Sequence, residues 1–355
     1  MSIRILEPDQ FGQIAHFPNL VLPHDADVFA ARARRFAQLA PGHAMEQFLL
    51  AMGQLAQAQQ HAYQARAASL TPAILLEQSR LHAMPPLSWQ NASRANDWQV
   101  DLDAIISQLA QHGAPALQDA ARALAELHSD RREALADAIL TGAFEPADAA
   151  DAASHALLAP VVGAALQVCW TRLAAALTAS DIGHVGASPV CPVCASRPVA
   201  SIVEIGAEQA DLRYLHCSLC SSNWHMVRVT CSSCESTKGI AYYSLSGADN
   251  TGGPSRKIAF ARAEACDACH SYLKIFTREK DPLMEASADD LATLTLDLLV
   301  DEAGYYRSGP NLLFAPGAAP PAPEQGSSPE QPAAEVVQPL ANPADKAAAK
   351  PSGSQ

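Results

Sequence analysis

The arrangement of the cysteines limits what this chain can fold into more than any other feature of its sequence. Eight of the nine cysteines form four Cys-x-x-Cys pairs within about eighty residues: Cys191/Cys194, Cys217/Cys220, Cys231/Cys234 and Cys266/Cys269. Two intervening residues let both sulfurs of one tight turn, or knuckle, face the same metal ion. Two knuckles complete a tetrahedral shell of four sulfurs, which suits zinc or rubredoxin-type iron. The four pairs therefore predict two complete metal sites with no paired cysteine left over.

The spacing leaves open which knuckles share a metal. The simplest arrangement joins neighbours, Cys191/Cys194 with Cys217/Cys220 and Cys231/Cys234 with Cys266/Cys269, but an interleaved arrangement is geometrically possible. Short β-rich runs lie between and beside the knuckles, as in zinc ribbons and rubredoxins. Modules of this size bury little apolar surface, so we expect the metal to supply much of their folding free energy.

The start of the chain and its apolar runs favour a reduced, cytoplasmic protein. Glu7 and Asp9 stand where a signal peptide requires an apolar segment. The longest apolar run, 156–166, contains Pro160 and is shorter than the ~20 residues that a membrane span requires. We therefore expect no stable membrane insertion, and metal binding is favoured over disulfide formation.

The charge of the chain argues against nucleic acid as a partner. The formal net charge is −13, and residues 191–278 carry nine basic and seven acidic side chains. Eight thiolates bound to two divalent ions add further negative charge to this region. A zinc-ribbon protein that reads nucleic acid usually presents a basic surface instead.

Composition and periodicity predict an α+β fold with an N-terminal helical bundle, two rubredoxin- or zinc-ribbon-like four-cysteine modules and a C-terminal helix. Helical periodicity recurs between residues 25 and 178, and the β-rich runs lie between 199 and 276. We expect four parts: a helical domain (1–183), a double metal-binding domain (184–278), a helix and segment packed on it (279–315), and a disordered Pro/Ala-rich tail (316–355).

The predicted C-terminal helix extends from Asp281, which can cap it, to Gly304, a suitable αL terminator. Asp290, Asp297 and Asp301 share one face of this helix. Such a face is usually solvated, although it can also serve as a docking surface.

Three further side chains have simple structural interpretations. Cys169 lies on the apolar face of a helix, where a buried and inert core thiol is expected. His216 and His225 flank knuckles, but eight cysteines already fill two tetrahedra, so we expect these histidines beside the metal sites or at the surface.

No nucleophile triad, phosphate-binding glycine loop or HExxH pattern occurs, so we expect a protein that is not an enzyme.

The knuckles and their flanking residues resemble those of the formate dehydrogenase accessory protein FdhE family. The resemblance is dense from about 188 to 308 and looser in the N-terminal half. It rests on these segments: Cys191-Pro-Val-Cys194; Arg213-Tyr-Leu-His-Cys217-Ser-Leu-Cys220; Trp224-His-Met-Val-Arg-Val-Thr-Cys231-Ser-Ser-Cys234; Cys266-Asp-Ala-Cys269-His-Ser-Tyr-Leu-Lys-Ile-Phe276; and Ala288-Asp-Asp-Leu-Ala-Thr-Leu-Thr-Leu-Asp297.

The resemblance implies a cytoplasmic, chaperone-like maturation factor that binds the catalytic subunit of formate dehydrogenase and carries rubredoxin-type iron. The knuckles of this chain differ from rubredoxin knuckles in one respect. The residue after each second cysteine is Ala195, Ser221, Glu235 or His270 where glycine is common. This departure leaves the ligand set intact and leaves zinc open beside iron.

Two alternative functions and one open question of assembly remain at this stage. A zinc-ribbon protein associated with nucleic acid is opposed by the charge. A rubredoxin-like electron carrier would require iron, because zinc is redox-silent. A homo-oligomer is also compatible with the sequence.

Overall fold

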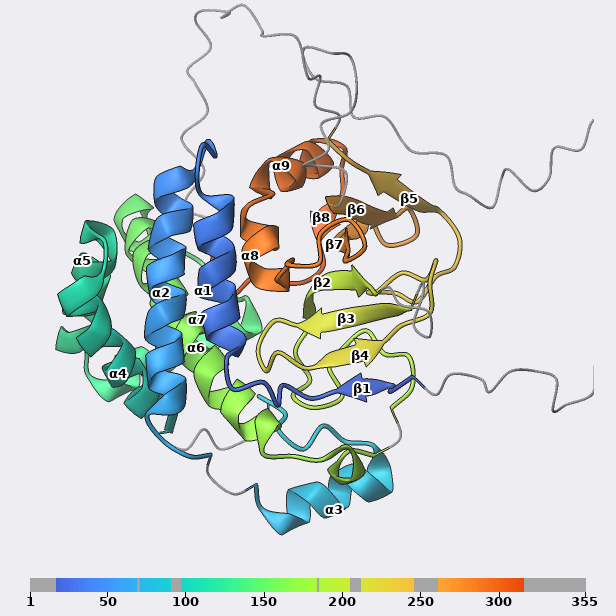
Figure 1. The fold of residues 1–355 in the computed structure, drawn as a ribbon, viewed down its shortest axis with the longest axis horizontal. Helices are drawn as coiled ribbons and strands as arrows, with labels where there is room; N and C mark the ends of the chain where they lie inside the picture. The colour runs from blue at the N-terminus through green and yellow to red at the C-terminus, as the bar shows by residue number, and fades with distance from the viewer. Residues whose placement is uncertain are drawn as a thin grey trace, which may run out of the picture.

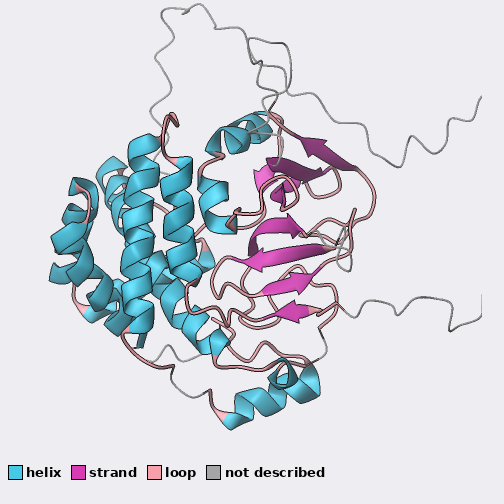
Figure 2. Cartoon of the chain, in the orientation of Figure 1, coloured by secondary structure: helices cyan, strands magenta, loops and turns pink. Residues whose placement is uncertain are grey.

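The computed structural model describes residues 17–68, 71–90, 97–183, 185–204, 212–245 and 261–315. Most helices of the N-terminal half gather on one side of the molecule and the strands on the other (Figures 1 and 2). This arrangement confirms the predicted mixed fold with a helical N-terminal region. The expected tail, 316–355, lies outside the described residues.

The helices of the N-terminal half pack around α7 and α2. Their bounds are α1 (Val28–Leu39), α2 (Glu46–Gln64), α3 (Ala73–His82), α4 (Asp97–His112), α5 (Pro115–Glu126), α6 (Ser129–Thr141) and α7 (Ala149–Ala175). These helices lie within the stretch 25–178 in which helical periodicity recurs, and α3 lies apart from the others in Figure 1.

Helix α7 is the central apolar element of the helical half. Asp148 begins it, because its side chain accepts a hydrogen bond from the Asp151 backbone N–H at 2.8 Å. By length and composition α7 is apolar enough to cross a membrane, but most of its apolar stretch is buried inside the fold. That burial is typical of the core helix of a globular protein.

The sheet consists of two mainly antiparallel portions joined by a parallel contact between β2 and β7, and β8 adds a second parallel contact at β7. The strand order is β1-β4-β3-β2-β7-β6-β5, and β8 pairs with β7. The strands are β1 (Leu20–Val21), β2 (Pro198–Val203), β3 (Arg213–Cys217), β4 (Asn223–His225), β5 (Ile240–Tyr243), β6 (Ala261–Cys266), β7 (Ser271–Thr277) and β8 (Tyr306–Arg307). The parallel contact between β2 and β7 joins the portion that carries Cys217 to the portion that carries Cys266.

One hydrophobic core extends from the helices into the first portion of the sheet. It contains Leu49 of α2 and Leu166 of α7 together with Cys194, Leu215 and Trp224. The sulfurs of this portion are therefore enclosed by helical side chains. The domain boundaries given above stay predictions.

The expected single helix over 281–303 is wrong in detail, because the structure contains two short helices, α8 (Ala286–Leu291) and α9 (Leu294–Glu302). Glu285 caps α8: its side chain accepts the Ala288 N–H at 2.7 Å, whereas Asp281 lies in the preceding turn. The break between the helices is stabilised by Lys274, whose ammonium donates to the backbone carbonyl oxygens of Asp290 and Thr293 at 2.8 and 3.1 Å.

The solvated-face interpretation is also wrong for two of the three aspartates. Asp290 is fully buried, and Asp297 is mostly buried beside Lys274 and Arg307. Helix α8 lies between α1 and the sheet, so its acidic side chains face basic partners and not water (Figure 1).

Candidate metal centre

The structure brings the eight paired cysteines together in two groups of four. The first cluster contains Cys191, Cys194, Cys217 and Cys220, and the second cluster contains Cys231, Cys234, Cys266 and Cys269. Within each cluster the four sulfurs lie within 4.8 Å of one another. The neighbouring arrangement is therefore the one that forms, and the interleaved alternative is excluded.

The sulfur spacing matches a tetrahedral metal shell and not a disulfide. In the first cluster Cys191 Sγ lies 3.6 Å from Cys220 Sγ, and Cys194 Sγ lies 3.4 Å from Cys217 Sγ. In the second cluster the corresponding distances, Cys231–Cys269 and Cys234–Cys266, are both 3.7 Å. A disulfide bond is about 2.05 Å long. A metal–sulfur bond of about 2.3 Å gives a tetrahedral edge of roughly 3.8 Å, so either cluster can hold a zinc- or iron-sized ion.

Each knuckle turns at a residue with a left-handed backbone conformation. The residues after the second cysteines, Ala195, Ser221, Glu235 and His270, have φ values of +64°, +57°, +61° and +53°. These are the four positions at which the sequence lacks the glycine common in rubredoxin knuckles. The turn brings the residue after the cysteine back onto the first cysteine, as shown by the bonds Ala195 N–H to Cys191 O and Glu235 N–H to Cys231 O.

The left-handed turns carry an energetic cost that the rest of the knuckle must offset. A non-glycine residue in this region costs about 1–2 kcal/mol. The backbone also donates to sulfur: the N–H groups of Val193, Leu219 and Ser233 lie 3.4 Å from the first sulfur of their knuckles. Such donors stabilise a thiolate, which is the form of cysteine that binds a metal.

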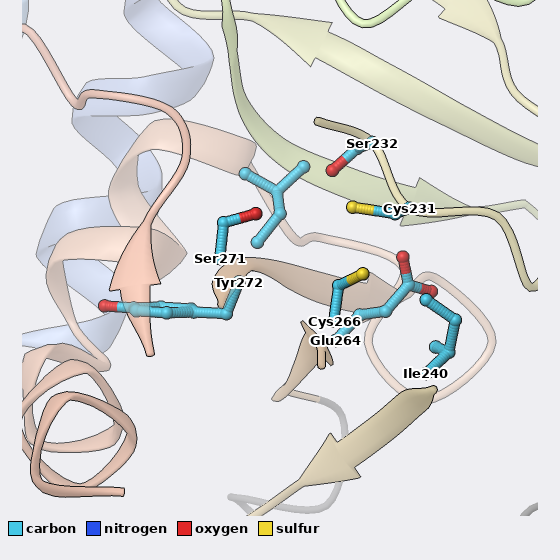
Figure 3. Close-up of a pocket in the computed structure, with 8 residues that line it drawn as sticks. Cys231, Ser232, Ile240, Glu264, Cys266, Ser271 and Tyr272 are labelled. Atoms are coloured by element: carbon cyan, nitrogen blue, oxygen red, sulfur yellow. The ribbon is translucent and has the colours of Figure 1, made fainter. Parts of the chain in front are cut away.

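The two clusters differ sharply in burial. All four cysteines of the first cluster are buried, whereas in the second Cys234 is exposed and Cys269 is half-buried. Figure 3 shows Cys231 and Cys266 of the second cluster with Glu264, Ser271 and Ile240 around them. The second cluster therefore has one side open to solvent or to a partner.

Burial and sulfur–sulfur contacts shift the thiol pKa values of the first cluster in opposite directions: burial opposes ionisation of Cys220, but hydrogen bonds from the neighbouring thiols and Ser222 hold its pKa well below the ordinary value. Burial raises the pKa of Cys191 and Cys217 well above the ordinary value, and neighbouring thiols contribute to the shift.

In the second cluster, burial raises the pKa of Cys231 to about 12. For Cys269, burial raises the pKa, but hydrogen bonds from Ser271 and the neighbouring cysteines lower it to about 7. Four thiolates this close together would repel one another, and a divalent cation between them would compensate their charge.

Helix α7 supports the first cluster through polar side chains that sequence reasoning missed. Gln167 Nε2 donates to the Ser218 carbonyl at 2.8 Å, inside the knuckle between Cys217 and Cys220. Thr171 Oγ1 lies 3.2 Å from Ser221 Oγ, the residue with positive φ in the same knuckle. Gln167 in turn accepts a hydrogen bond from buried Arg32 of α1 at 2.8 Å. The sequence does contain a trace of this role, because Gln167 and Thr171 are two polar residues one helical turn apart on an apolar helix.

The other singled-out residues take no part in the sulfur clusters. Neither cluster, as found among the described residues, includes a histidine. His216 Nδ1 lies 2.8 Å from Asn223 Oδ1, and His225 packs against Phe17 with ring centroids 4.9 Å apart. Cys169 is buried, and burial raises the pKa of its thiol to about 12, which agrees with an inert core position.

Comparison with known proteins gives consistent matches along almost the whole described chain. Family models described as FdhE, N-terminal, FdhE, central domain and FdhE, C-terminal domain match residues 17–187, 190–228 and 229–314. The first cluster lies in the central match and the second in the C-terminal match.

Individual relatives agree with the family match. A protein FdhE homolog of Pseudomonas aeruginosa is 39% identical over 319 residues, which cover 89% of this chain and 99% of that protein. A protein FdhE homolog of Edwardsiella ictaluri is 38% identical over 324 residues, which cover 89% of this chain and 100% of that protein. The crystal structure of the FdhE protein from Pseudomonas aeruginosa superposes with a TM-score of 0.74 at 39% identity, covering 85% of this chain and 100% of that one.

Proposed function

The chain belongs to the FdhE family, and we propose that it is a cytoplasmic accessory factor that binds the catalytic subunit of a formate dehydrogenase while the active enzyme forms. The observation that carries this proposal is the series of three consecutive family matches, which cover residues 17–187, 190–228 and 229–314. Membership of this family supports an accessory role in formate dehydrogenase formation. We propose that the protein acts by association and not by turnover of its own substrate.

We further propose that the eight clustered cysteines bind two metal ions, either iron in rubredoxin-type sites or zinc. The tetrahedral sulfur spacing and the N–H donors to sulfur support this assignment. When bound, iron would supply one-electron exchange, whereas zinc would supply only structural stability. The first cluster suits a structural role, because all four of its cysteines are buried and share a core with the helices.

A rubredoxin-like electron carrier is the second candidate, and the exposure of Cys234 favours it. An ion held by Cys234 would lie at the molecular surface, where a redox partner can approach it. Zinc in the clusters would exclude the electron carrier, whereas iron is compatible with both candidates, so partner capture separates them. Only the accessory role requires a lasting complex with the dehydrogenase subunit.

The metal part of the proposal is tested on the full-length protein, purified anaerobically with metal analysis. Wild type should carry two equivalents of metal, and a Cys191→Ser/Cys194→Ser variant should carry about one and be less stable. Cys169→Ala is the matched control, because it removes a buried cysteine outside both clusters and should keep two equivalents. An unchanged stoichiometry in the double variant would reject the assignment.

The partner part is tested by co-purification and by gene deletion. Wild-type protein should capture the catalytic subunit, and deletion should leave that subunit present but inactive. Deleting the helices is a poor test, because the first cluster shares a core with α7 and would be exposed. Normal dehydrogenase activity in the deletion strain would contradict the accessory role.

A further inference from the structure

Arg213 connects the strand of the first cluster to the second cluster. It begins β3, the strand that ends at Cys217, and only 1% of its side chain is exposed. Its guanidinium group makes three hydrogen bonds: Nε to Ser201 Oγ at 2.6 Å, Nη1 to the Thr230 carbonyl at 2.8 Å, and Nη2 to Glu264 Oε1 at 2.7 Å. The side chain of Arg213, which begins on the strand of the first cluster, therefore binds residues that lie next to the second cluster.

Two of the three acceptors lie one or two residues before ligands of the second cluster. Thr230 precedes Cys231 in the chain, and Glu264 lies two residues before Cys266 on β6. One guanidinium group thus holds both chain segments that enter the second cluster, one for each knuckle. Figure 3 shows the Glu264 carboxylate beside Cys231 and Cys266. Its second oxygen accepts a hydrogen bond from the Tyr242 hydroxyl on β5 at 2.9 Å.

Burying the Arg213–Glu264 ion pair has a high cost in desolvation free energy. The side chains of Arg213 and Glu264 are only 1% and 3% exposed. Removing such charges from water costs free energy that their attraction only partly repays, and apolar replacements of both partners are often neutral or stabilising. Simple cohesion of the sheet therefore does not explain the pair. Orientation does, because the planar guanidinium fork fixes three acceptors from three different segments at once.

We propose that Arg213 is a positioning residue for the second cluster, because it fixes the segments that carry Cys231 and Cys266 from the strand that carries Cys217. This inference rests on the proposal that both clusters bind metal. It implies that when strand β3 is held in its folded position at the first cluster, the second cluster binds its metal more tightly. By linkage, metal in the second cluster then favours the ordered β3 strand in return.

Cobalt(II) titration of the full-length protein tests the inference, since four-thiolate cobalt absorbs visible light and reports each filled site directly. Wild type should take up two equivalents. In Arg213→Met the first equivalent should bind as in wild type, and the second should bind about 10–100-fold more weakly, as for other lost supports of metal ligands. Adding Arg213→Met to a Cys231→Ser/Cys234→Ser variant should leave the single remaining affinity unchanged. Arg278→Met, which breaks a partly exposed ion pair with Glu204, is the matched control and should bind both equivalents normally.

A second variant separates positioning from mere charge balance. Arg213→Met/Glu264→Gln removes both buried charges, so thermal stability should largely recover while the second cobalt affinity stays low. Arg213→Lys should also lower the affinity for the second cobalt ion, because one ammonium group cannot bind the three acceptors that the planar guanidinium group holds. If Arg213→Met does not fold, the charge-balanced double variant carries the comparison. Normal binding of the second equivalent by the double variant would overturn the inference, whereas failure of wild type to bind two equivalents would overturn the metal proposal beneath it.

Discussion

Lys274 offers a quantitative test of how the C-terminal helices are attached to the sheet. Its side chain is fully buried, and its ammonium lies 3.2 Å from Asp290 Oδ1 and 2.5 Å from Asp297 Oδ2. It also donates to the backbone at the junction of α8 and α9. Arg307 supplies the second cation, at 2.7 Å from Asp290 and 3.3 Å from Asp297. Two cations and two carboxylates therefore balance inside the fold.

Lys274→Met removes one of these cations and nearly preserves the side-chain volume. Burial by itself would raise the pKa of Asp290, but the charges of Arg307 and Lys274 outweigh burial. The net effect lowers the pKa, so this carboxyl is ionised in the native protein. The variant leaves two carboxylates facing one arginine, together with the backbone carbonyl oxygens that Lys274 no longer satisfies. Breaking a buried pair by removing one partner costs about 3–5 kcal/mol, and we expect a loss of that size in the free energy of unfolding.

Urea unfolding followed by circular dichroism measures this loss at neutral pH. Lys238→Met, the same substitution at an exposed position, should stay within about 0.5 kcal/mol of wild type. Lys274→Met/Asp297→Asn restores the charge balance and should recover part of the loss. A cost below about 1 kcal/mol for Lys274→Met would refute the reasoning, because it would mean that the charges are solvated or that the carboxylates take up protons freely.

Three further predictions follow from particular positions. Glu235→Gly should raise the free energy of unfolding by about 0.5–1 kcal/mol, because glycine adopts the positive φ of this exposed position without strain. Glu235→Ala keeps the strain and should not raise it. Equal effects of the two variants in urea melts would contradict this. A chromogenic chelator should remove metal in two phases, with the fast phase absent from Cys231→Ser/Cys234→Ser, because Cys234 is exposed; a single phase in wild type would show that exposure does not control release. Burial lowers the pKa of His155, although Asp151 partly opposes the shift, so the unfolded chain takes up this proton first and stability should fall as pH drops below about 6.5. His155→Phe keeps the ring stacked on Phe144 and should flatten that part of the pH profile of stability; an unchanged profile would assign the slope to other groups.

Much of the metal centre could be predicted from local spacing. Two residues between cysteines determine that both sulfurs of a knuckle face one point, whatever surrounds the knuckle. The β-rich stretch between 199 and 276 and the apolar face with Cys169 are likewise local patterns. Strands β2 to β7 lie in or at the ends of the described part of that stretch, and Cys169 is buried, although the bounds of the strands differ from the runs in the sequence. The left-handed residues after each knuckle were visible as missing glycines, but their conformation became clear only from the backbone.

The supporting residues could not be predicted, because their partners are distant in the chain. Gln167 and Ser218 are separated by 51 residues, as are Arg213 and Glu264. The same applies to the C-terminal helices. Capping residues and periodicity predicted one helix with a solvated aspartate face. The structure instead has two helices, and buried Lys274 of β7 donates to the backbone at their junction and pairs with buried Asp290.

The sequence by itself determined the eight candidate ligands, the mixed fold and the family, because these depend on residue types at short, regular spacings. The tertiary structure decided which knuckles share a cluster, because that depends on how the strands are joined across the sheet. It also decided that helices enclose the first cluster while the second remains open at Cys234. Burial is a property of packed surfaces from distant segments, and no local pattern of residues specifies it.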